Sequence, residues 1–189
     1  MNLLTVFLDA NVLYSAGLRD LLMRLALQGL FRIKWTKQVH EEWIENLLKR
    51  RSDITREKLE RTYQLMLQFA PDSLVQHYEP LIKSITLPDP DDRHVLAAAI
   101  KGKATLIVTF NLSDFPPATL QRYGIEAWHP DLFICHLLDL NSEQVYKAIR
   151  QHRTALKNPP KSVNEYLGER EKDGLVVAVS RLWGSIEEL

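Results

Sequence analysis

Short apolar runs alternate with amphipathic stretches along the first 130 residues. The runs "LLTVFL", "FRIKW", "ATLIVTF" and "GIEAW" predict four short strands. Between them, apolar residues recur at helical spacing over 18–27, 36–50, 55–69 and 91–101, with Thr36 and Thr55 as expected helix caps and Gly102 as an expected helix end. The stretch 72–88 has no clear period and is compatible with a short strand. This alternation predicts an α/β fold with a mainly parallel sheet.

Beyond Pro130 the pattern is helical only. It predicts helices at Pro130–Leu138 and Ser142–Leu156 and two weaker ones within 162–185. "KNPPKS" at 157–162 reads as a linker because it is rich in proline and polar residues. We therefore expect one α/β domain over 1–130 and an all-helical C-terminal extension over 131–189.

The composition indicates the cellular environment of the protein more clearly than its function. Lys plus Arg equals Asp plus Glu, at 24 each, so any nucleic-acid binding must depend on local patches. Cys135, the single cysteine, excludes an intramolecular disulfide and a cysteine-rich zinc site, and its apolar setting "DLFICHLL" predicts a buried thiol. No apolar run approaches the roughly 20 residues that span a bilayer, and the N-terminus lacks the basic region and cleavage site of a secretion signal. These features predict a reducing, cytoplasmic setting without a membrane anchor.

Acidic residues lie at or near the ends of the predicted strands: Asp9, Glu41, Glu42, Asp92 and Asp114. Parallel sheets bind ligands outside the carboxyl ends of their strands, where such residues converge. Clustered carboxylates repel one another unless cations compensate them. Oxygen ligands suit Mg²⁺ and Mn²⁺, and such ions usually act on phosphates. The joint placement therefore indicates phosphodiester hydrolysis.

Each of these carboxylates also has a local explanation. Asp9 fits a cap of the next turn, Asp114 fits the start of the "DFPP" turn, and acidic residues over 36–51 fit a solvated helix face. Helical phase does not separate Glu41 from Glu42. The hypothesis of a site therefore depends on the set, not on any one member.

The stretch "LPDPDDRHVLAAAI" combines a helix start with a candidate ligand. Asp89 fits the cap, Pro90 fits the first helical position, and Asp91 suits the helix dipole. Asp92 instead falls on the same stripe as the apolar positions 95, 96 and 99, so its carboxylate needs a partner. His94, in the first turn, is expected to be exposed or capping, with a phosphate contact as the alternative.

Three segments, "VFLDANVLYSAG", "WTKQVHEEWIENLLKRR" and "DPDDRHVLAAAIKGKATLIVTFNLSDFP", resemble the PIN domain and, within it, the VapC-type ribonuclease toxins of bacterial toxin–antitoxin pairs. The resemblance covers about residues 3–130, and the helical tail resembles an extension found in a subset of these toxins. It implies a three-layer α/β/α fold, a parallel sheet of four or five strands and an acidic pocket that holds Mg²⁺ or Mn²⁺.

The resemblance also assigns residues by position. The four catalytic acidic residues correspond to Asp9, Glu42, Asp92 and Asp114, of which Asp9, Asp92 and Asp114 are expected to bind the metal. Asn11 and Thr109 match polar residues that support the pocket. Asn111 stands where many relatives have a further acidic residue, so the number of metal ions, one or two, is left open.

The implied activity is that of a metal-dependent endoribonuclease, the toxin of a type II pair, which cleaves RNA by metal-activated water. Glu42 or Asp114 is expected to orient that water. Basic residues should surround such a pocket, and the candidates for RNA binding are Arg93, Lys49, Arg50 and Arg51. A solvated surface explains the last three equally well, and Arg93 could pair with Asp89. Expected partners are RNA, a cognate antitoxin and a second copy of the chain.

Two other readings compete with this one. A non-catalytic PIN-like module that binds RNA or protein would also keep the fold. Another magnesium-dependent phosphodiesterase or phosphatase would keep the carboxylates, although a dehalogenase-type phosphatase needs an aspartate where Asn11 stands. A P-loop enzyme is excluded because the glycine-rich phosphate-binding motif is missing.

Overall fold

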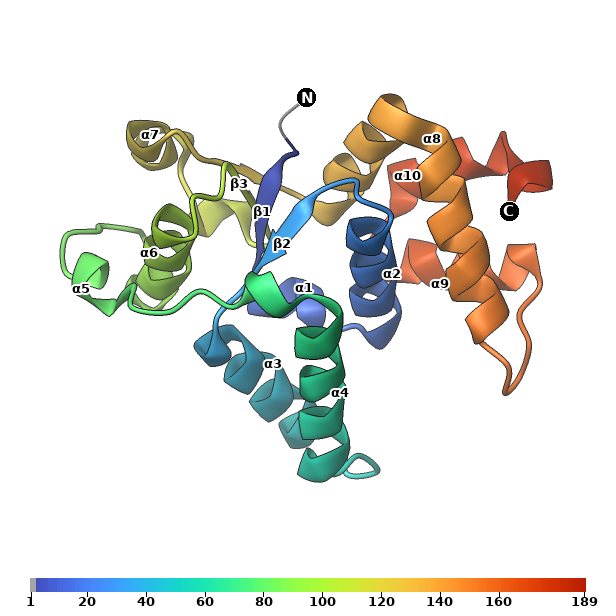
Figure 1. Cartoon of the computed structure of the whole chain (residues 1–189), viewed down its shortest axis with the longest axis horizontal. Helices are drawn as coiled ribbons and strands as arrows, with labels where there is room; N and C mark the ends of the chain where they lie inside the picture. Colours follow the sequence, from blue (N-terminus) through green and yellow to red (C-terminus); the bar gives the residue numbers. More distant parts are fainter. Residues whose placement is uncertain (1–2) are drawn as a thin grey trace.

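The computed structural model describes residues 3–189 as four strands and ten helices (Figure 1). The strands are β1 (Thr5–Leu8), β2 (Arg32–Lys34), β3 (Leu106–Val108) and β4 (Glu126–Trp128). The helices are α1 (Ala10–Leu13), α2 (Ala16–Leu27), α3 (Lys37–Arg50), α4 (Arg56–Phe69), α5 (Glu79–Ile82), α6 (Arg93–Lys101), α7 (Pro117–Leu120), α8 (Pro130–Ala155), α9 (Val163–Lys172) and α10 (Val176–Trp183). All four strands predicted from the sequence are present.

The four strands form one parallel sheet in the order β2-β1-β3-β4. In the central pair, Leu8 is in register with Val108, so the residues that follow both strands emerge side by side. The backbone N–H of Asp9 donates to the carbonyl of Val108 at 3.1 Å and extends this pairing by one step. The register therefore brings Asp9 and Thr109 to the same edge of the sheet.

Helices cover both faces of the sheet and complete the three-layer α/β/α fold (Figure 1). α5, α6 and α7 lie on one side, and α2 and α8 lie on the other. The central strands are buried on both faces, with Val6, Phe7 and Leu8 inaccessible to solvent. Small buried side chains at 97–99 let α6 approach the sheet closely.

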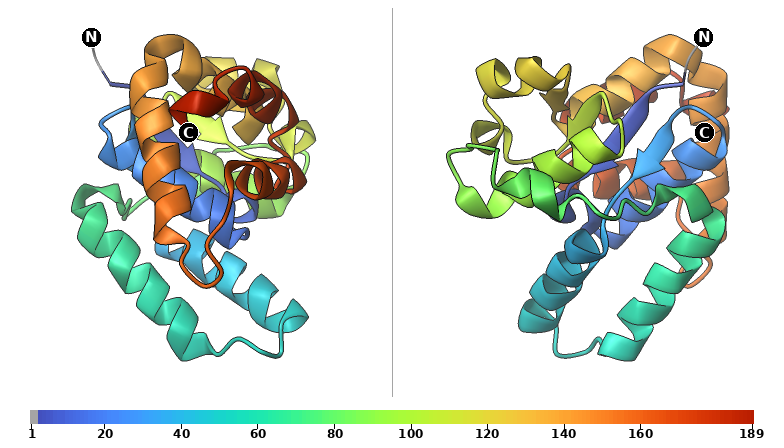
Figure 2. Two further views of the ribbon diagram at one scale, coloured as in Figure 1. Left: turned by 90° about the vertical axis from the view of Figure 1, so that its right-hand side faces the viewer. Right: turned by 60° about the vertical axis from the view of Figure 1, so that its left-hand side comes forward.

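The helices α3 and α4 form a hairpin that projects away from the sheet (Figure 2). Thr36 caps α3 as predicted, since its hydroxyl accepts from the backbone N–H of Val39 at 3.1 Å. Thr55 precedes α4 as predicted, but its side chain forms no capping hydrogen bond. Within the hairpin, the ring of His40 packs on that of Tyr63 with 4.0 Å between centroids.

The structure differs from the predicted elements in two places. No strand forms within 72–88; the chain instead makes a 3₁₀ turn at Pro71–Ser73, a single bridge between Trp35 and Leu74, and then α5. The helix expected from residue 91 begins two residues later, because Pro90–Asp92 form a 3₁₀ turn capped by the carboxylate of Asp89.

The C-terminal part is helical, as predicted. α8 runs through both predicted helices but breaks its helical geometry at Asn141, where φ is −162° and ψ is 81°. The side chain of Asn141 accepts from the N–H of Gln144 at 3.1 Å, so it caps the second half. A loop over the predicted linker then leads to α9, which opens with a capping box between Ser162 and Glu165.

The extension packs on the α/β part through shared core residues. Phe133 of α8 meets Phe31 edge to face, with 4.9 Å between ring centroids. Asp131, also on α8, accepts from the backbone N–H groups of Val177 and Ala178 and so caps α10. Cys135 is buried in this region, as predicted. One continuous apolar core thus runs through both parts, and the boundary at residue 130 stays a prediction.

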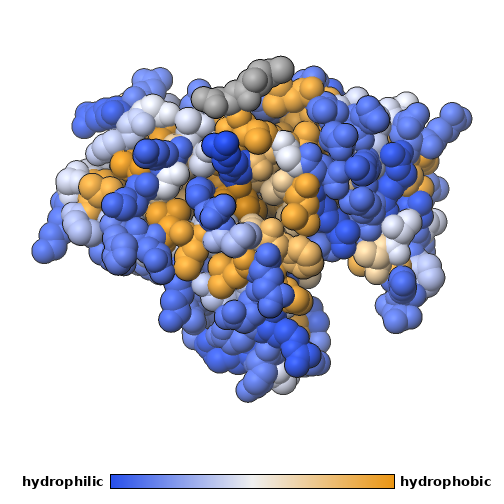
Figure 3. All heavy atoms as spheres, in the orientation of Figure 1, coloured by the Kyte–Doolittle hydropathy of each residue, from blue (hydrophilic) through white to orange (hydrophobic). Residues whose placement is uncertain are grey.

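Apolar side chains also reach the surface where α2, β2 and the end of α4 meet (Figure 3). Leu27 and Phe69 are 52% and 60% exposed there. Across residues 3–189, no helix combines the length and the apolar character that a membrane crossing requires.

Candidate active site

Asp9 is the most firmly held carboxylate at the carboxyl edge of the sheet. It directly follows β1 and is the N-cap of α1, where one carboxylate oxygen accepts from the backbone N–H of Ala10 at 2.7 Å. The other oxygen accepts from the Thr109 hydroxyl and from the Asn11 amide, each at 2.7 Å. Burial raises the pKa of Asp9, and the hydrogen bonds from Thr109 and Ala10 oppose that shift. A buried carboxylate fixed in this way is a preorganised ligand or base.

Asn11 and Thr109 join the loops that follow β1 and β3. The Asn11 amide donates to the Thr109 hydroxyl oxygen at 3.0 Å, and its carbonyl oxygen accepts from the N–H of Phe110 at 3.1 Å. The N–H of Asn111 donates to the same Thr109 oxygen at 3.0 Å. Thr109 is fully buried. Both residues thus donate a hydrogen bond to Asp9.

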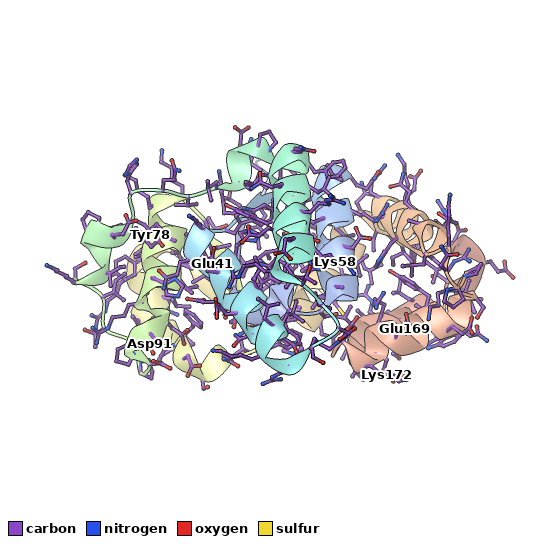
Figure 4. All side chains as sticks on the ribbon, turned by 90° about the horizontal axis from the view of Figure 1, so that it is seen from below. Glu41, Lys58, Tyr78, Asp91, Glu169 and Lys172 are labelled. Atoms are coloured by element: carbon purple, nitrogen blue, oxygen red, sulfur yellow. The ribbon has the colours of Figure 1, made fainter. Side chains whose placement is uncertain are left out.

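The helix α3 presents Glu42, not Glu41, to the site. Glu42 lines the pocket, and one of its oxygens lies 3.0 Å from Nε2 of His94. Glu41 pairs with Arg56 at 3.2 Å, and its side chain is labelled in Figure 4. The choice that helical phase left open is therefore resolved by position.

The expectation that His94 is exposed or capping is wrong. His94 is only 5% exposed, and it faces Glu42. Its Nδ1 is buried without a hydrogen-bond partner among the described residues. The reason is that His94 lies three and four residues before Ala97 and Ala98 and so shares their buried face of α6.

Asp92 is a second carboxylate whose pKa is raised. It lies where the 3₁₀ turn meets α6 and is partly buried. Desolvation, followed by the charges of Asp9, Asp114 and Asp89, raises the pKa of Asp92 from 3.8 to about 7. Asp92 is thus close enough to other carboxylates to resist ionisation in the absence of a cation.

These side chains surround an open pocket of about 420 Å³. Its walls are formed by Asp9, Ala10, Asn11, Tyr14, Glu42, Asn46, Arg50, Asp92 and Asn111. Asp114, in the 3₁₀ turn Leu112–Asp114, is outside this lining but raises the pKa of Asp92 through its charge. Three carboxylates and three amides therefore line one pocket at the edge of the sheet, and Asp114 lies near enough to act on Asp92 through its charge.

The oxygen donors of the pocket are of the type that a hard divalent cation binds, but they do not surround an ion on all sides. Within residues 3–189, no three Asp, Glu, His or Cys side chains are gathered closely enough to enclose an ion. Mg²⁺ commonly uses one or two carboxylates and keeps several waters, so Asp9 and Asp92 suffice as a starting set. Burial first, and then the charges of the nearby carboxylates, raise the pKa of Asp92, and a bound cation would favour its ionised form.

Of the four basic residues predicted to bind RNA, Arg50 lines the pocket and the other three do not. Arg50 is on the pocket wall, with its guanidinium 5.7 Å from the centroid of the Tyr14 ring. Arg51 instead forms two hydrogen bonds to Asp53, at 2.7 and 2.6 Å, and Lys49 is exposed outside the pocket lining. Arg93, half-buried, has an Nε without a hydrogen-bond partner in the described chain.

Sequence reasoning missed Asn46 and Tyr14 as pocket residues. A signal for Asn46 exists, since residues 42, 46 and 50 repeat every four positions and share one face of α3. Tyr14 carries no comparable signal, because its place depends on how α1 ends.

Comparisons with known proteins match two parts of the chain to family models. The family model described as "PIN domain" matches residues 5–113, and the model described as "VapC50 C-terminal domain" matches residues 130–183. Over 82 residues, the chain is 44% identical to a Mycobacterium tuberculosis protein named "Putative ribonuclease VapC50", covering 42% of this chain and 48% of that protein. The match thus spans about half the length of the relative. No solved structure matches the chain significantly.

Proposed function

The chain belongs to the PIN-domain family, and from this premise we propose that it is a Mg²⁺- or Mn²⁺-dependent endoribonuclease, the toxin of a type II toxin–antitoxin pair. The observation that carries the proposal is the convergence of Asp9, Glu42 and Asp92 on one pocket at the carboxyl edge of the sheet. The related protein named as a ribonuclease supports RNA as the substrate class. Residues 1–130 would form the catalytic domain and 131–189 an extension.

In this proposal, Asp9 and Asp92 on the pocket wall would hold the cation first, and Asp114, outside the lining, would join them as a third ligand. When bound, the ion supplies a positive charge to the phosphate and makes water a better nucleophile at neutral pH. The Asp9 carboxylate is held in one orientation, because Thr109 and Asn11 both donate a hydrogen bond to one of its oxygens. A rigid first ligand lowers the cost of organising the site when substrate arrives.

In this proposal, Glu42 orients the attacking water and accepts its proton. His94 holds one Glu42 oxygen at 3.0 Å, and the Gln38 amide donates to the same oxygen at 3.1 Å. The second Glu42 oxygen is left for the water. Asn111, exposed on the pocket wall, offers an amide to substrate or solvent.

Arg50 is the basic residue best placed to meet an RNA phosphate, because it shares the pocket wall with the carboxylates. Arg93 is a second candidate for RNA binding, whereas Arg51 already forms an ion pair with Asp53. A cognate antitoxin and a homodimer are the further partners that we propose from the family alone.

The direct test is cleavage of RNA by the purified chain. With Mg²⁺ or Mn²⁺, structured RNA should be cut at internal positions, and a chelator should abolish cutting because the carboxylates lack their cation. Single-stranded and duplex DNA of the same sequence serve as controls. Expression in a bacterium should arrest growth.

Intact RNA in both metals, with the protein shown to be folded, would contradict the proposal. Cleavage that persists in chelator would equally exclude metal dependence. Preference for DNA would favour the alternative phosphodiesterase.

A further inference from the structure

The C-terminal extension contacts residues next to the pocket through the α9–α10 turn, which comprises Arg170–Gly174, the end of α9 and the two residues that follow it. α9 packs beside α2 (Figure 1). The Ser15 hydroxyl donates to one carboxylate oxygen of Asp173 at 2.6 Å. Ser15 directly follows the pocket residue Tyr14 and also accepts from the N–H of Leu18 as the cap of α2. The turn therefore holds the chain where it leaves the pocket wall.

Arg170 strengthens this attachment. Its Nε donates to the second oxygen of Asp173 at 2.8 Å, and its side chain is only 7% exposed. Its guanidinium rests on Gly17, where an added Cβ would lie 2.1 Å from Nη2. Only a glycine allows so close an approach, so the start of α2 fits this contact.

The same turn touches the loop after β3. Gly174 has a φ of +91°, and a Cβ built there would lie 3.0 Å from Cε1 of Phe110. The backbone N–H of Phe110 donates to the side-chain oxygen of Asn11. The side-chain N–H of Asn11 in turn donates to Asp9. His129, which precedes α8, packs edge to face on the Phe110 ring with 4.9 Å between centroids.

We infer that the α9–α10 turn is a positioning element of the active site. Through Asp173 it holds the loop that follows α1, and through Gly174 it sets the place of Phe110 and hence of Asn11. This inference rests on the proposed function for its catalytic meaning. Figure 4 shows the molecule from below, where α9 with Glu169 and Lys172 is visible on the same side as α3 with Glu41.

Other contacts attach the extension without touching the pocket. His152 of α8 lies between Asp20 of α2, at 3.3 Å, and the Tyr166 hydroxyl of α9, at 2.9 Å. These contacts keep the extension docked when the turn alone is altered. A small change in the turn should therefore disturb the pocket and leave the fold in place.

The test replaces Gly174 with alanine. Its Cβ would lie 3.0 Å from Cε1 of Phe110, so the ring must shift slightly, and kcat should fall by about 2- to 10-fold with little change in KM. The change Phe110→Leu, added to Gly174→Ala, removes the contacted ring atom and should restore most of the rate. Asp173→Ala, which frees Ser15, is expected to act in the same direction.

Two glycines provide matched controls. Gly124→Ala places alanine at a positive φ of +66° in open space, so it reproduces the backbone strain without the contact. Gly168→Ala lies within α9, where nothing is within 4 Å of the added Cβ. Both controls should keep the wild-type kcat.

The NMR signals of the Asn11 side-chain amide give a readout that needs no activity. They should shift in Gly174→Ala and Asp173→Ala and stay in place in the two controls. If wild type cleaves no RNA, the proposed function fails, while these signals still decide the positioning role. Unchanged Asn11 signals and kcat in both turn variants, or an equal loss in Gly124→Ala, would overturn the inference.

Discussion

The Asp9→Asn variant is expected to cleave RNA more than ~100-fold more slowly than wild type. Residues that only support a metal ligand typically cost about 10- to 100-fold when replaced, and Asp9 would be the ligand itself. Asparagine keeps the shape of the side chain and one acceptor oxygen for Ala10, so the fold should persist. The rate constant of cleavage in Mg²⁺ and Mn²⁺, and growth on expression, provide the measurements.

The matched control for Asp9→Asn is Asp91→Asn. Asp91 is exposed, is adjacent to Asp92 and does not line the pocket. This control should cleave RNA at the wild-type rate and arrest growth. Equal toxicity of wild type and Asp9→Asn would exclude the catalytic reading and favour a binding module.

The Asp92→Asn variant is expected to be more stable than wild type at high pH in metal-free buffer. The pKa of Asp92 is about 7 in the folded protein against 3.8 as the ordinary value. Between these values the folded state holds a proton that the unfolded state releases, so wild type loses stability as the pH rises. Asparagine cannot ionise, and the variant should escape that loss.

Thermal unfolding at about pH 5 and about pH 8 measures this effect. The midpoint of Asp92→Asn should exceed that of wild type by about 2–4 °C at the higher pH, the change that about 1 kcal/mol makes in a protein of this size. The gain should shrink at the lower pH, where Asp92 is protonated. A variant that is less stable than wild type at the higher pH would show that ionisation of Asp92 does not destabilise the folded protein.

The strands and the main helices could be predicted because their patterns are local. "ATLIVTF" and "FRIKW" are short apolar runs, and each became a strand of the parallel sheet. Even the break in α8 at Asn141 was visible as the gap between two predicted helices. Such features depend on periodicity and on caps within a few residues.

The fold of 72–88 could not be predicted because its contacts are distant. Leu74 bridges to Trp35, and Val75 donates to the carbonyl of Trp35 at 2.8 Å, so this segment follows β2 without becoming a strand. Neither contact has a signal in the local sequence. The same limit applies to Tyr14 on the pocket wall.

The candidate site was predictable as a set and not in its details. The parallel register carries Asp9 and Thr109 to one edge, which follows from two strands ending in polar residues. The burial of His94 was missed, although His94 lies three and four residues before the buried Ala97 and Ala98, because its partner Glu42 comes from another helix. The bond from Ser15 to Asp173 spans 158 residues and had no sequence signal.

Binding of Mn²⁺ to the metal-free protein tests the central claim most directly. Isothermal calorimetry near neutral pH should show saturable binding by wild type and by Asp91→Asn, and binding should be lost or much weaker in Asp9→Asn. Protons should be released on binding, because the cation favours the ionised form of Asp92. Equal Mn²⁺ affinity in all three proteins, or no binding by wild type, would contradict a cation site at this edge of the sheet.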